Sequence, residues 1–523
     1  QGTPGADLDL TREPADAGLT LLTLAWVLRT TLVPTGKIPT RYITCVQRTS
    51  PSGGSRHPTE LAVILCRSLG EIPTGTYTYD IASHSLVAEP AEVHAEYAAA
   101  LPDRDFGILV RTRVERAMWR YRDLRALRPV LIDAGHVSEL VTFLLGRAGI
   151  STELVSAPVA SLRPSWLEEP EVALIRPCAS AQREAPSSLL LPKRAFRSQD
   201  DAGAYLTSPA LVLRFGKSMY ASAFWPSPRN ISIDLTDFLV LNHCLPSTRG
   251  DRDSSAAGIT RAVPDASVAA IERLHEAGAL LAAGDAQLLY DSIRPWIRHE
   301  WYMAFLAYLE ILGHGTERPV ASRIDNDGAY IGDLGTLFRR RTSRAFSPAP
   351  LAVGQVENLI HRVFQNGQHP GLEISLASWN VNGLGPGLYR WRNGRLIHVD
   401  DAPERAMVAA NSAGQTGVSA GALAIWVSSL TEVDRPQRYQ MDLVDLGRLG
   451  QRICMVATEL GMATFLTPAV YDTETCSMLG IEAADRRLTY VFGLGVPRTA
   501  QQPVINGGLS ASHLPSVSER SPR

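Results

Sequence analysis

The sequence predicts an α+β fold in which two similar units follow one another along the chain and are joined by a smaller middle module. The chain has 523 residues, which is more than one ordinary hydrophobic core accommodates. Short motifs recur at a constant distance, which indicates an internal repeat. Within each copy, segments of helical periodicity alternate with short apolar runs, as they do in domains that mix helices and strands.

The repeat is carried by four motifs that recur at a constant offset of 312 residues. These pairs are His57-Pro58 with His369-Pro370, Gly75-x-Tyr77 with Gly387-x-Tyr389, Asp133-Ala134-Gly135 with Asp445-Leu446-Gly447, and Gly149 with Gly461. Four matches without a net insertion favour duplication of one unit over coincidence.

Each copy contains the same predicted elements in the same order. Apolar residues follow Gly135 and Gly447 at helical spacing, so we expect a helix to start at each and to end at Gly149 and Gly461 as C-caps. Short apolar or alternating runs predict strands at Leu61–Cys66, Glu373–Ala377, Val172–Arg176 and Leu488–Leu494.

These elements divide the chain into residues 1–195 and 335–498 as the two units, 196–334 as the middle module, and 499–523 as a Ser- and Pro-rich tail that we expect to be disordered. In the module, residues 206–219 and 231–241 predict short strands or a strand and a helix, and Val268–Ala282 predicts an amphipathic helix. This order is winged-helix-like. A plain helical spacer is the alternative interpretation.

Bulk composition excludes several classes of function. The net charge is −2 and the pI is about 6.7, so nothing favours nucleic acid or an anionic membrane as a partner. We expect no membrane span and no signal peptide. The six cysteines are scattered without metal-ligand spacing, so we predict no metal site, and reduced thiols in the cytoplasm.

Two segments carry residues suited to a bound ligand. Arg339–Phe346 reads RRRTSRAF, a dense set of guanidinium and hydroxyl groups that suits phosphate oxygens. Pro51–Arg56 reads PSGGSR, a turn whose glycines let the backbone approach a ligand closely. Taken singly, the first is more often a solvated face and the second an ordinary loop.

Together with their surroundings, these segments resemble a known family. The blocks RTSPSGGSRHPTELAVIL, GTYTYD and WRYRDLRALRPVLIDAGH, with RRTSRAF in the second unit, are similar to the azoline (thiazoline and oxazoline) dehydrogenases of ribosomal peptide natural-product pathways. These enzymes belong to the nitroreductase flavoprotein superfamily. The resemblance covers about 48–178 and 338–498. It implies two tandem nitroreductase-like units that pair as a pseudo-dimer within one chain, with FMN held between them.

In that superfamily the Arg-rich element grips the phosphate of FMN from one unit, and the Pro-Ser loop reaches the isoalloxazine from the other. Here the two copies are unequal. Aligning Leu351 with Leu19 places the RRTSR element on LDLTR, where Asp9 repels phosphate, and the Pro-Ser loop aligns with 363–366 (VFQN). We therefore expect one composite FMN site per chain. Its cofactor-binding residues are Arg340, Arg341, Thr342, Arg344, Ser52, Gly53, Gly54, Ser55, Arg56 and Arg498.

The family's azoline dehydrogenases carry a Lys-Tyr pair where this chain has Arg120-Tyr121. A guanidinium stays protonated and cannot easily act as the base that takes the Cα proton. The resemblance nevertheless implies both residues as catalytic candidates, Arg120 to stabilise negative charge and Tyr121 to act through a hydrogen-bonded water. Packing against the core is the alternative for both. We expect His136, next to a predicted helix start, to be structural.

The resemblance implies FMN-dependent oxidation of azoline rings to azoles in a modified precursor peptide, with a cyclodehydratase as a further partner. One alternative is an NAD(P)H-dependent nitro or flavin reductase, and another is a non-catalytic scaffold for peptide-modifying enzymes. The molecule would be a pseudo-dimeric monomer or a higher oligomer.

Overall fold

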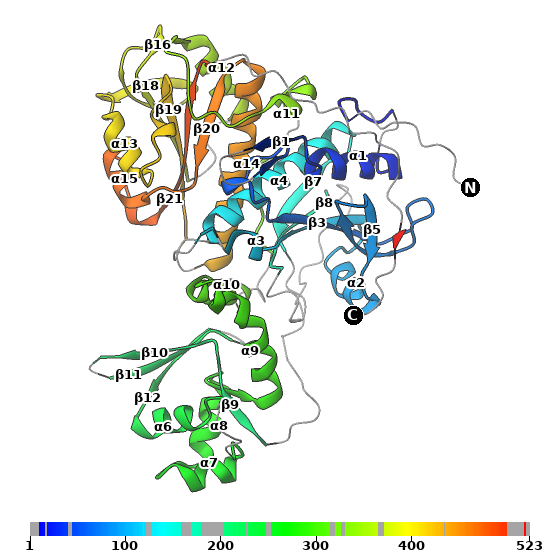
Figure 1. The fold of residues 1–523 in the computed structure, drawn as a ribbon, viewed down its shortest axis with the longest axis vertical. Helices are drawn as coiled ribbons and strands as arrows, with labels where there is room; N and C mark the ends of the chain where they lie inside the picture. Colours follow the sequence, from blue (N-terminus) through cyan, green and yellow to red (C-terminus); the bar gives the residue numbers. More distant parts are fainter. Residues whose placement is uncertain are drawn as a thin grey trace.

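The computed structural model describes residues 10–15, 18–39, 44–118, 120–121, 127–157, 169–178, 203–216, 218–225, 228–246, 253–313, 319–325, 330–364, 371–432, 435–498 and 517–518. Two units of helices and sheet lie side by side, one drawn from blue to cyan and the other from yellow to orange (Figure 1). The green middle module projects below them.

The sheet of the first unit has the strand order β22-β5-β4-β3-β6-β8-β7. Its strands are β3 (Thr59–Leu65), β4 (Gly75–Asp80), β5 (Ser85–Ala88), β6 (Phe106–Thr112), β7 (Thr152–Ser156), β8 (Glu171–Pro177) and β22 (Val517–Ser518). All neighbours are antiparallel except β22, which pairs in parallel with β5. Two residues of the tail that we expected to be disordered are thus a strand; the rest of that tail lies outside the described residues.

The sheet of the second unit repeats this topology, with the order β18-β17-β15-β19-β21-β20. Its strands are β15 (Leu372–Ser378), β17 (Gly387–Arg392), β18 (Arg395–Asp400), β19 (Leu423–Leu430), β20 (Ala463–Thr467) and β21 (Arg487–Gly495). Each strand stands where its counterpart stands in the first sheet, and every pairing is again antiparallel. The predicted duplication is confirmed.

The helices outside the centre follow the same pairing. Helix α1 (Leu21–Leu32) corresponds to α12 (Val353–Val363), which starts 332 residues later, the offset expected from aligning Leu19 with Leu351. The other short elements of the two units are β1 (Gly36–Pro39), β2 (Thr44–Gln47), α2 (Ala91–Ala98), α3 (Glu115–Met118), α11 (Gly335–Arg339), β14 (Leu351–Ala352), β16 (Val381–Asn382), α13 (Arg405–Asn411) and α15 (Asp472–Met478).

Two long buried helices, α4 (Leu127–Arg147) and α14 (Pro436–Glu459), join the units across a pseudo-twofold axis. They touch at Gly135 and Gly447. A Cβ on Gly135 would overlap the Val444 carbonyl oxygen and lie 2.8 Å from the Gly447 Cα, and a Cβ on Gly447 would overlap the Ile132 carbonyl oxygen. Glycine is therefore required where the two backbones touch.

This contact corrects one expectation. Helix α4 starts at Leu127, so Gly135 and His136 lie in its middle and not at its start. Among the described residues, α4 is long and apolar enough to cross a bilayer by length and composition, but almost all of it is buried inside the protein. Its apolarity follows from its place between two sheets and a partner helix.

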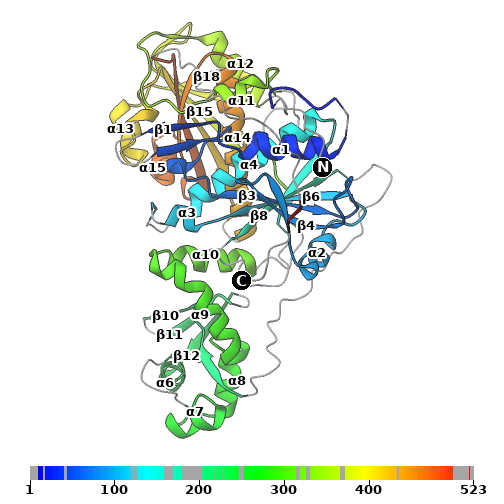
Figure 2. The same cartoon turned by 45° about the vertical axis from the view of Figure 1, so that its right-hand side comes forward.

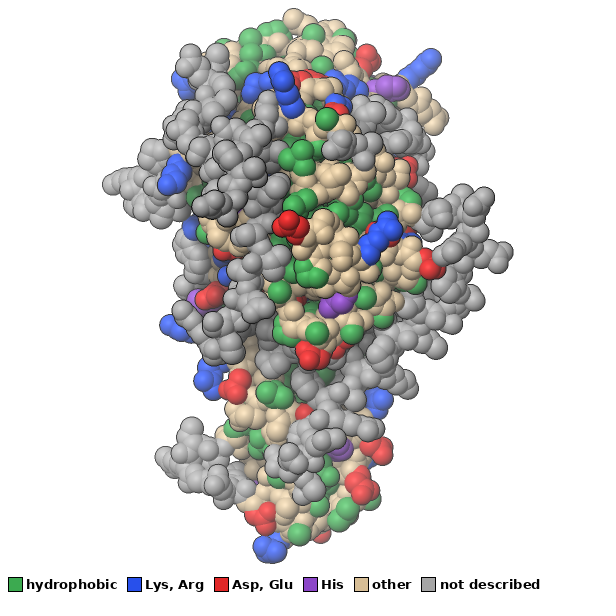
Figure 3. Space-filling view, turned by 90° about the vertical axis from the view of Figure 1, so that its right-hand side faces the viewer, with side chains coloured by type: hydrophobic (Ala, Val, Ile, Leu, Met, Phe, Trp, Pro, Cys, Tyr) green, Lys and Arg blue, Asp and Glu red, His purple; other side chains and the backbone are tan. Residues whose placement is uncertain are grey.

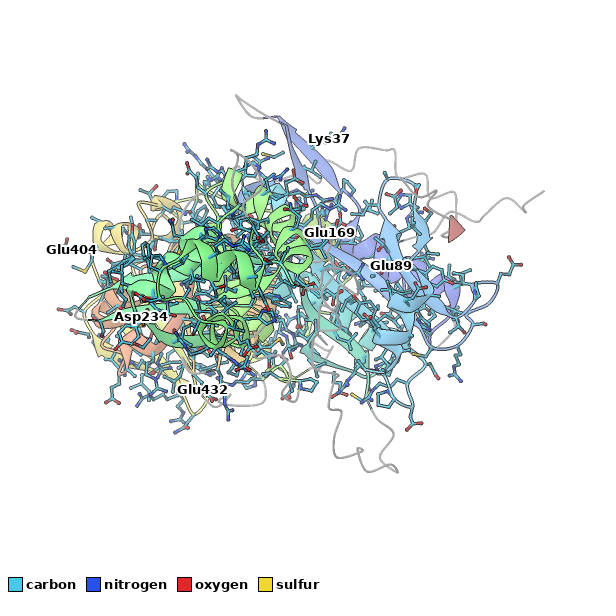
Figure 4. All side chains as sticks on the ribbon, turned by 90° about the horizontal axis from the view of Figure 1, so that it is seen from below. Lys37, Glu89, Glu169, Asp234, Glu404 and Glu432 are labelled. Carbon is cyan, nitrogen blue, oxygen red and sulfur yellow. The ribbon has the colours of Figure 1, made fainter. Side chains whose placement is uncertain are left out.

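Smaller features repeat the symmetry. The Tyr77 hydroxyl donates to the Pro73 carbonyl (2.8 Å), and the Tyr389 hydroxyl donates to the Gly385 carbonyl (2.9 Å). Seen from below, Glu89, just before α2, and Glu404, just before α13, lie on opposite sides of the molecule (Figure 4). Acidic and basic side chains are interspersed on the face drawn in Figure 3, as the small net charge predicts.

The middle module has its own small core and two sheets, β10-β11-β12 and β9-β13. Its elements are β9 (Tyr205–Thr207), β10 (Leu211–Phe215), β11 (Met219–Ala223), β12 (Arg229–Ile233), α6 (Leu235–His243), α7 (Ala256–Ala262), α8 (Val268–Glu276), β13 (Leu280–Ala282), α9 (Ala283–Arg298) and α10 (Tyr302–Gly313). The helix predicted over Val268–Ala282 ends at Glu276, because Leu280–Ala282 pairs with β9 instead. The winged-helix-like character of the module stays a prediction.

Candidate functional site

The Pro-Ser loop, which we define as residues 51–57, lies between β2 and β3 and is fastened to α4 by one carboxylate. The Ser52 hydroxyl donates to the Asp133 Oδ2 (2.6 Å), and the Gly53 amide donates to the same oxygen (3.1 Å). The His57 amide in turn donates to the Ser52 Oγ (2.8 Å). Gly54, Ser55 and His57 all have positive φ, at 60°, 54° and 47°, so the loop is tightly bent.

The charge states of the loop follow from burial. Burial raises the pKa of Asp133 to about 7, opposed by the hydrogen bonds from Ser52 and Gly53. Burial, with the charge of Arg48 next, lowers the pKa of His57 to about 3. The His57 Nε2 pairs with the Val46 carbonyl (2.9 Å). A neutral histidine with a backbone partner supports the turn and is no candidate base.

Both catalytic candidates lie against this loop. A Cβ on Gly53 would come within 2.6 Å of the Tyr121 Oη, and a Cβ on Gly54 within 3.8 Å of the Arg120 Cγ. The missing side chain of Gly53 is therefore what lets the Tyr121 phenol approach the turn, whereas Arg120 lies at ordinary van der Waals distance from the position beside Gly54. Burial, then the charge of Asp133, raises the pKa of Tyr121 to about 12, so the phenol is protonated near neutral pH.

Arg56 completes this side of the site. Its pKa is lowered by burial, and Arg120 lowers it further while Cys45 and Tyr121 raise it. Because Arg120 and Tyr121 both affect the pKa of Arg56, the three side chains lie near one another. The chain thus brings the loop, from before β3, and the pair after α3 to the same place.

Arg340, from the second unit, reaches the Pro-Ser side of the first. Its Nε donates to the Thr49 carbonyl (2.9 Å) and its Nη2 to the Arg48 carbonyl (3.2 Å), directly before the loop. Arg340 is 4% exposed, and its Nη1 has no hydrogen-bond partner among the described residues. Burial lowers the pKa of Arg340 to about 10. A buried guanidinium with an unused nitrogen suits an anionic or carbonyl-bearing cofactor.

The rest of the Arg-rich segment passes β20 and the residues that follow β21. Thr342 forms a bridge with Thr464, and Phe346 forms one with Pro497. Thr342 and Arg344 of this segment are exposed, and so is Arg498, which follows Pro497 in the sequence. These three residues lie on neighbouring backbone segments at the surface of the second unit.

Arg341 differs from its neighbours. Its Nη1 donates to the carbonyls of Phe338 and Arg340, both at 2.7 Å, and burial lowers its pKa. This guanidinium stabilises the turn after α11, so Arg341 is less suited to a ligand than Arg340.

The structure adds Gln451 and Tyr490, which the sequence did not single out, as partners of His136. His136 Nδ1 pairs with the Gln451 Oε1 (3.1 Å), and His136 Nε2 pairs with the Tyr490 hydroxyl (3.0 Å). Gln451 also donates to the Thr49 carbonyl (3.4 Å), which Arg340 holds as well. A buried polar chain therefore links both central helices to the backbone before the loop. Only tertiary contact brings these residues together, so no local signal marks them.

Arg48 is a second buried cation at this place. Burial, with the charge of Arg116 next, lowers its pKa to about 10, and its Nε has no hydrogen-bond partner among the described residues. Arg48 stands directly before the Thr-Ser-Pro-Ser-Gly-Gly run, and that position was the one available signal in the sequence.

The pseudo-symmetric counterpart of the Pro-Ser site is closed. Asp445, which corresponds to Asp133, accepts from the Ser322 hydroxyl and from the Arg323 amide (2.9 Å). The Ser322-Arg323 pair thus takes the place that Ser52 and Gly53 take in the first site. It belongs to the segment between α10 and α11, at the end of the middle module.

Buried ion pairs fill the remainder of the counterpart site. Glu139 accepts from Arg448 Nε (2.9 Å) and from Arg452 Nε (2.6 Å), and Arg448 also donates to the Ile324 carbonyl (2.7 Å). The predicted loss of the phosphate grip at Leu8 and Asp9, and residues 365 and 366 of the altered loop, lie outside the described residues. Across the described residues, no group of three or more His, Cys, Asp or Glu side chains could hold a metal ion.

The fold of the chain is similar to that of solved structures. A structure from Anabaena variabilis, named as a nitroreductase, superposes with a TM-score of 0.57 at 18% identity, covering 95% of this chain and 93% of that one. Shorter matches include the E. coli microcin synthetase McbBCD complex (TM-score 0.27, 16% identity, 34% of this chain and 74% of that one). Another is the NADPH:FMN oxidoreductase of Vibrio harveyi (TM-score 0.24, 14% identity, 32% and 69%). The chain therefore has the nitroreductase fold that its sequence resembles.

At the level of sequence, no family model matches the chain. The trifolitoxin-processing protein TfxB of Rhizobium leguminosarum bv. trifolii is 33% identical over 102 residues, which are 18% of this chain and 27% of that protein. The match thus spans about a quarter of the length of its curated relative.

Proposed function

We propose that this protein is an FMN-dependent dehydrogenase that oxidises thiazoline or oxazoline rings of a modified precursor peptide to thiazole or oxazole rings. The observation that carries the proposal is the meeting of Tyr121 and Arg120 with Gly53 and Gly54, beside a buried Arg340 from the other unit. The likeness to a protein that processes trifolitoxin supports a peptide as the substrate.

The residues present fit FMN. Thr342, Arg344 and Arg498 offer exposed hydroxyl and guanidinium groups for the phosphate, and Arg340 offers a buried N–H for which the described part of the chain supplies no hydrogen-bond partner. Residues 52–56 offer backbone at close approach for the ring system. When bound, FMN supplies the hydride acceptor that the oxidation of an azoline ring needs. One composite site per chain follows, because the counterpart site is occupied by Ser322 and Arg323.

The chain's own residues handle the proton and the charge. The Tyr121 phenol, with its pKa raised to about 12, holds its proton and can orient a water that takes the Cα proton of the ring and passes it to solvent. The positive charge of the Arg120 guanidinium lowers the cost of negative charge that develops on the substrate. Asp133 holds the loop still through Ser52 and Gly53.

One experiment separates this function from its alternatives. The purified protein is assayed for bound flavin by absorbance and then incubated with an azoline-bearing peptide in air. We expect a yellow protein, the loss of two hydrogens per ring in the mass spectrum, and oxygen as the electron acceptor. Rapid bleaching of the flavin by NADH or NADPH without ring oxidation would instead indicate a nitro or flavin reductase. A colourless protein that binds the peptide would indicate a scaffold.

The same proposal predicts the surroundings of the enzyme. The precursor peptide is its partner, a cyclodehydratase supplies the azoline, and the middle module helps to hold the peptide. We expect the protein in the cytoplasm, where peptides of this kind are modified before export.

A further inference from the structure

We propose that Trp301, which belongs to the middle module, is a positioning residue for Tyr121 and so completes the site of the first unit from outside that unit. The inference rests on the proposed function only in that Tyr121 takes part in the reaction. Trp301 and Tyr121 lie 180 residues apart in the sequence and are joined by a hydrogen bond.

The contact is a hydrogen bond from the indole Nε1 of Trp301 to the backbone carbonyl of Tyr121. Trp301 is 1% exposed. On the other side, the amides of Arg120 and Tyr121 donate to the Ala117 carbonyl, at 2.9 Å and 3.0 Å. The Tyr121 backbone is therefore fixed from two directions, by the end of α3 and by the module.

The indole is itself held rigidly. Trp301 joins α9 to α10, its amide donates to the Trp296 carbonyl (2.7 Å), and its carbonyl accepts from the Phe305 amide (2.9 Å). Its ring packs on that of Trp296, with 6.0 Å between centroids. Glu300, just before it, has a positive φ of 65°, a conformation uncommon for a residue with a side chain. These contacts and the turn at Glu300 thus fix the orientation of the Trp301 indole.

The site gives the phenol little room, so the position of its backbone matters. The Tyr121 Oη lies 2.6 Å from the place that a Cβ on Gly53 would take. A shift of the backbone by a fraction of an ångström would move the phenol off the turn of Gly53 and Gly54. In two views α10 lies beneath the units, next to α3 (Figures 1 and 2). A displacement of the module is therefore transmitted to Tyr121.

The main test replaces Trp301 by phenylalanine, which keeps an aromatic ring and removes the donor. We expect turnover of the azoline peptide to fall by about tenfold to a hundredfold, the scale of a small misplacement, with KM and flavin content unchanged. Hydrogen exchange of the backbone amides in Glu115–Tyr121 should become faster. Trp379→Phe is the matched control, because that indole donates to the Pro403 carbonyl (3.1 Å) in the second unit; it should change neither readout.

A double-mutant cycle shows whether Trp301 acts through Tyr121. In the Tyr121→Phe background, Trp301→Phe should cause no further loss of turnover. A further loss of tenfold or more would overturn the proposal, and so would unchanged turnover in the single Trp301→Phe variant.

The hydrogen-exchange measurement separates a failure of the role proposed for Trp301 from a failure of the proposed function. If the parent protein oxidises no azoline, the proposed function fails, and exchange in Glu115–Tyr121 alone decides on Trp301: unchanged rates overturn it. If Trp301→Phe does not fold, 3-benzothienylalanine at position 301 replaces the indole N–H by sulfur in the same shape. The same outcomes then apply to that variant.

Discussion

Removing Arg340 and Arg344 together should yield a folded protein without flavin. Arg340 is buried, and none of the described residues forms an ion pair with it. The phosphate of FMN carries close to two negative charges near neutral pH. A charge-assisted hydrogen bond contributes about 1.5–3 kcal/mol, so the loss of two weakens binding by about 3–6 kcal/mol, which is roughly a hundredfold or more.

The assay is flavin per chain from the absorbance spectrum, with urea unfolding to show that the variant is folded. Arg339→Ala is the matched control. Arg339 stands in the same run of arginines but is exposed and bonded to Asp333 Oδ2 (2.6 Å) and to the Thr336 hydroxyl (2.9 Å). Because a surface pair of this kind contributes little, the control should stay yellow and almost equally stable.

Three results would refute the reasoning. They are a double variant that retains the flavin content of the parent, a control that loses its flavin as completely as the double variant, and a parent that binds two flavins per chain at saturation. The last would mean that Ser322 and Arg323 do not close the counterpart site.

Three further predictions concern single residues. Tyr121→Phe should slow ring oxidation by about a hundredfold or more at unchanged flavin content, since it removes the proton-handling group; equal rates would remove Tyr121 from the mechanism. Asp133 has a folded-state pKa raised from 3.8 to about 7, so its contribution to stability is present at low pH and lost as pH rises through that window. Unfolding free energy of the parent should then fall by up to about 1.4 kcal/mol per pH unit there, and urea titrations should show that Asp133→Asn removes this slope. Gly135→Ala should destabilise the whole chain by about 1–3 kcal/mol or more through its overlap with the Val444 carbonyl; Gly354→Ala, where a Cβ meets nothing within 4 Å, should be neutral or stabilising in the same melts.

The duplication was predictable because local motifs mark it. The Gly-x-Tyr turns at Gly75 and Gly387 each begin a strand, and the tyrosine of each turn donates back to a carbonyl four residues earlier. Such features depend on a few adjacent residues, so they survive in the sequence of both copies. The matching strand orders of the two sheets follow from them.

What depends on distant contacts was not predictable. Gly135 was interpreted as a helix start, but it lies in the middle of α4 because Gly447 of α14 touches it there. The helix expected over Val268–Ala282 ends early because Leu280–Ala282 pairs with β9. In both cases the local structure depends on a contact with a distant part of the chain, which local periodicity does not reveal.

The candidate site shows the same division. The Pro-Ser loop and the Arg-rich segment could be found from composition, and the pairing of Arg340 with the backbone before that loop joins them. The role that we propose for Trp301 could not be predicted, because Trp301 meets Tyr121 through a hydrogen bond across the interface between the module and the first unit.

The charges at the two counterpart sites explain why we expect only one of them to bind FMN. A buried charge is costly unless a partner compensates it. In the counterpart site Glu139 pairs with both Arg448 and Arg452, so each of these guanidinium groups has a carboxylate beside it. At the positions equivalent to Arg448 and Glu139, the other site has the neutral pair His136 and Gln451. There the buried Arg340 has no ion-pair partner among the described residues, and an anionic cofactor is the partner that would compensate it.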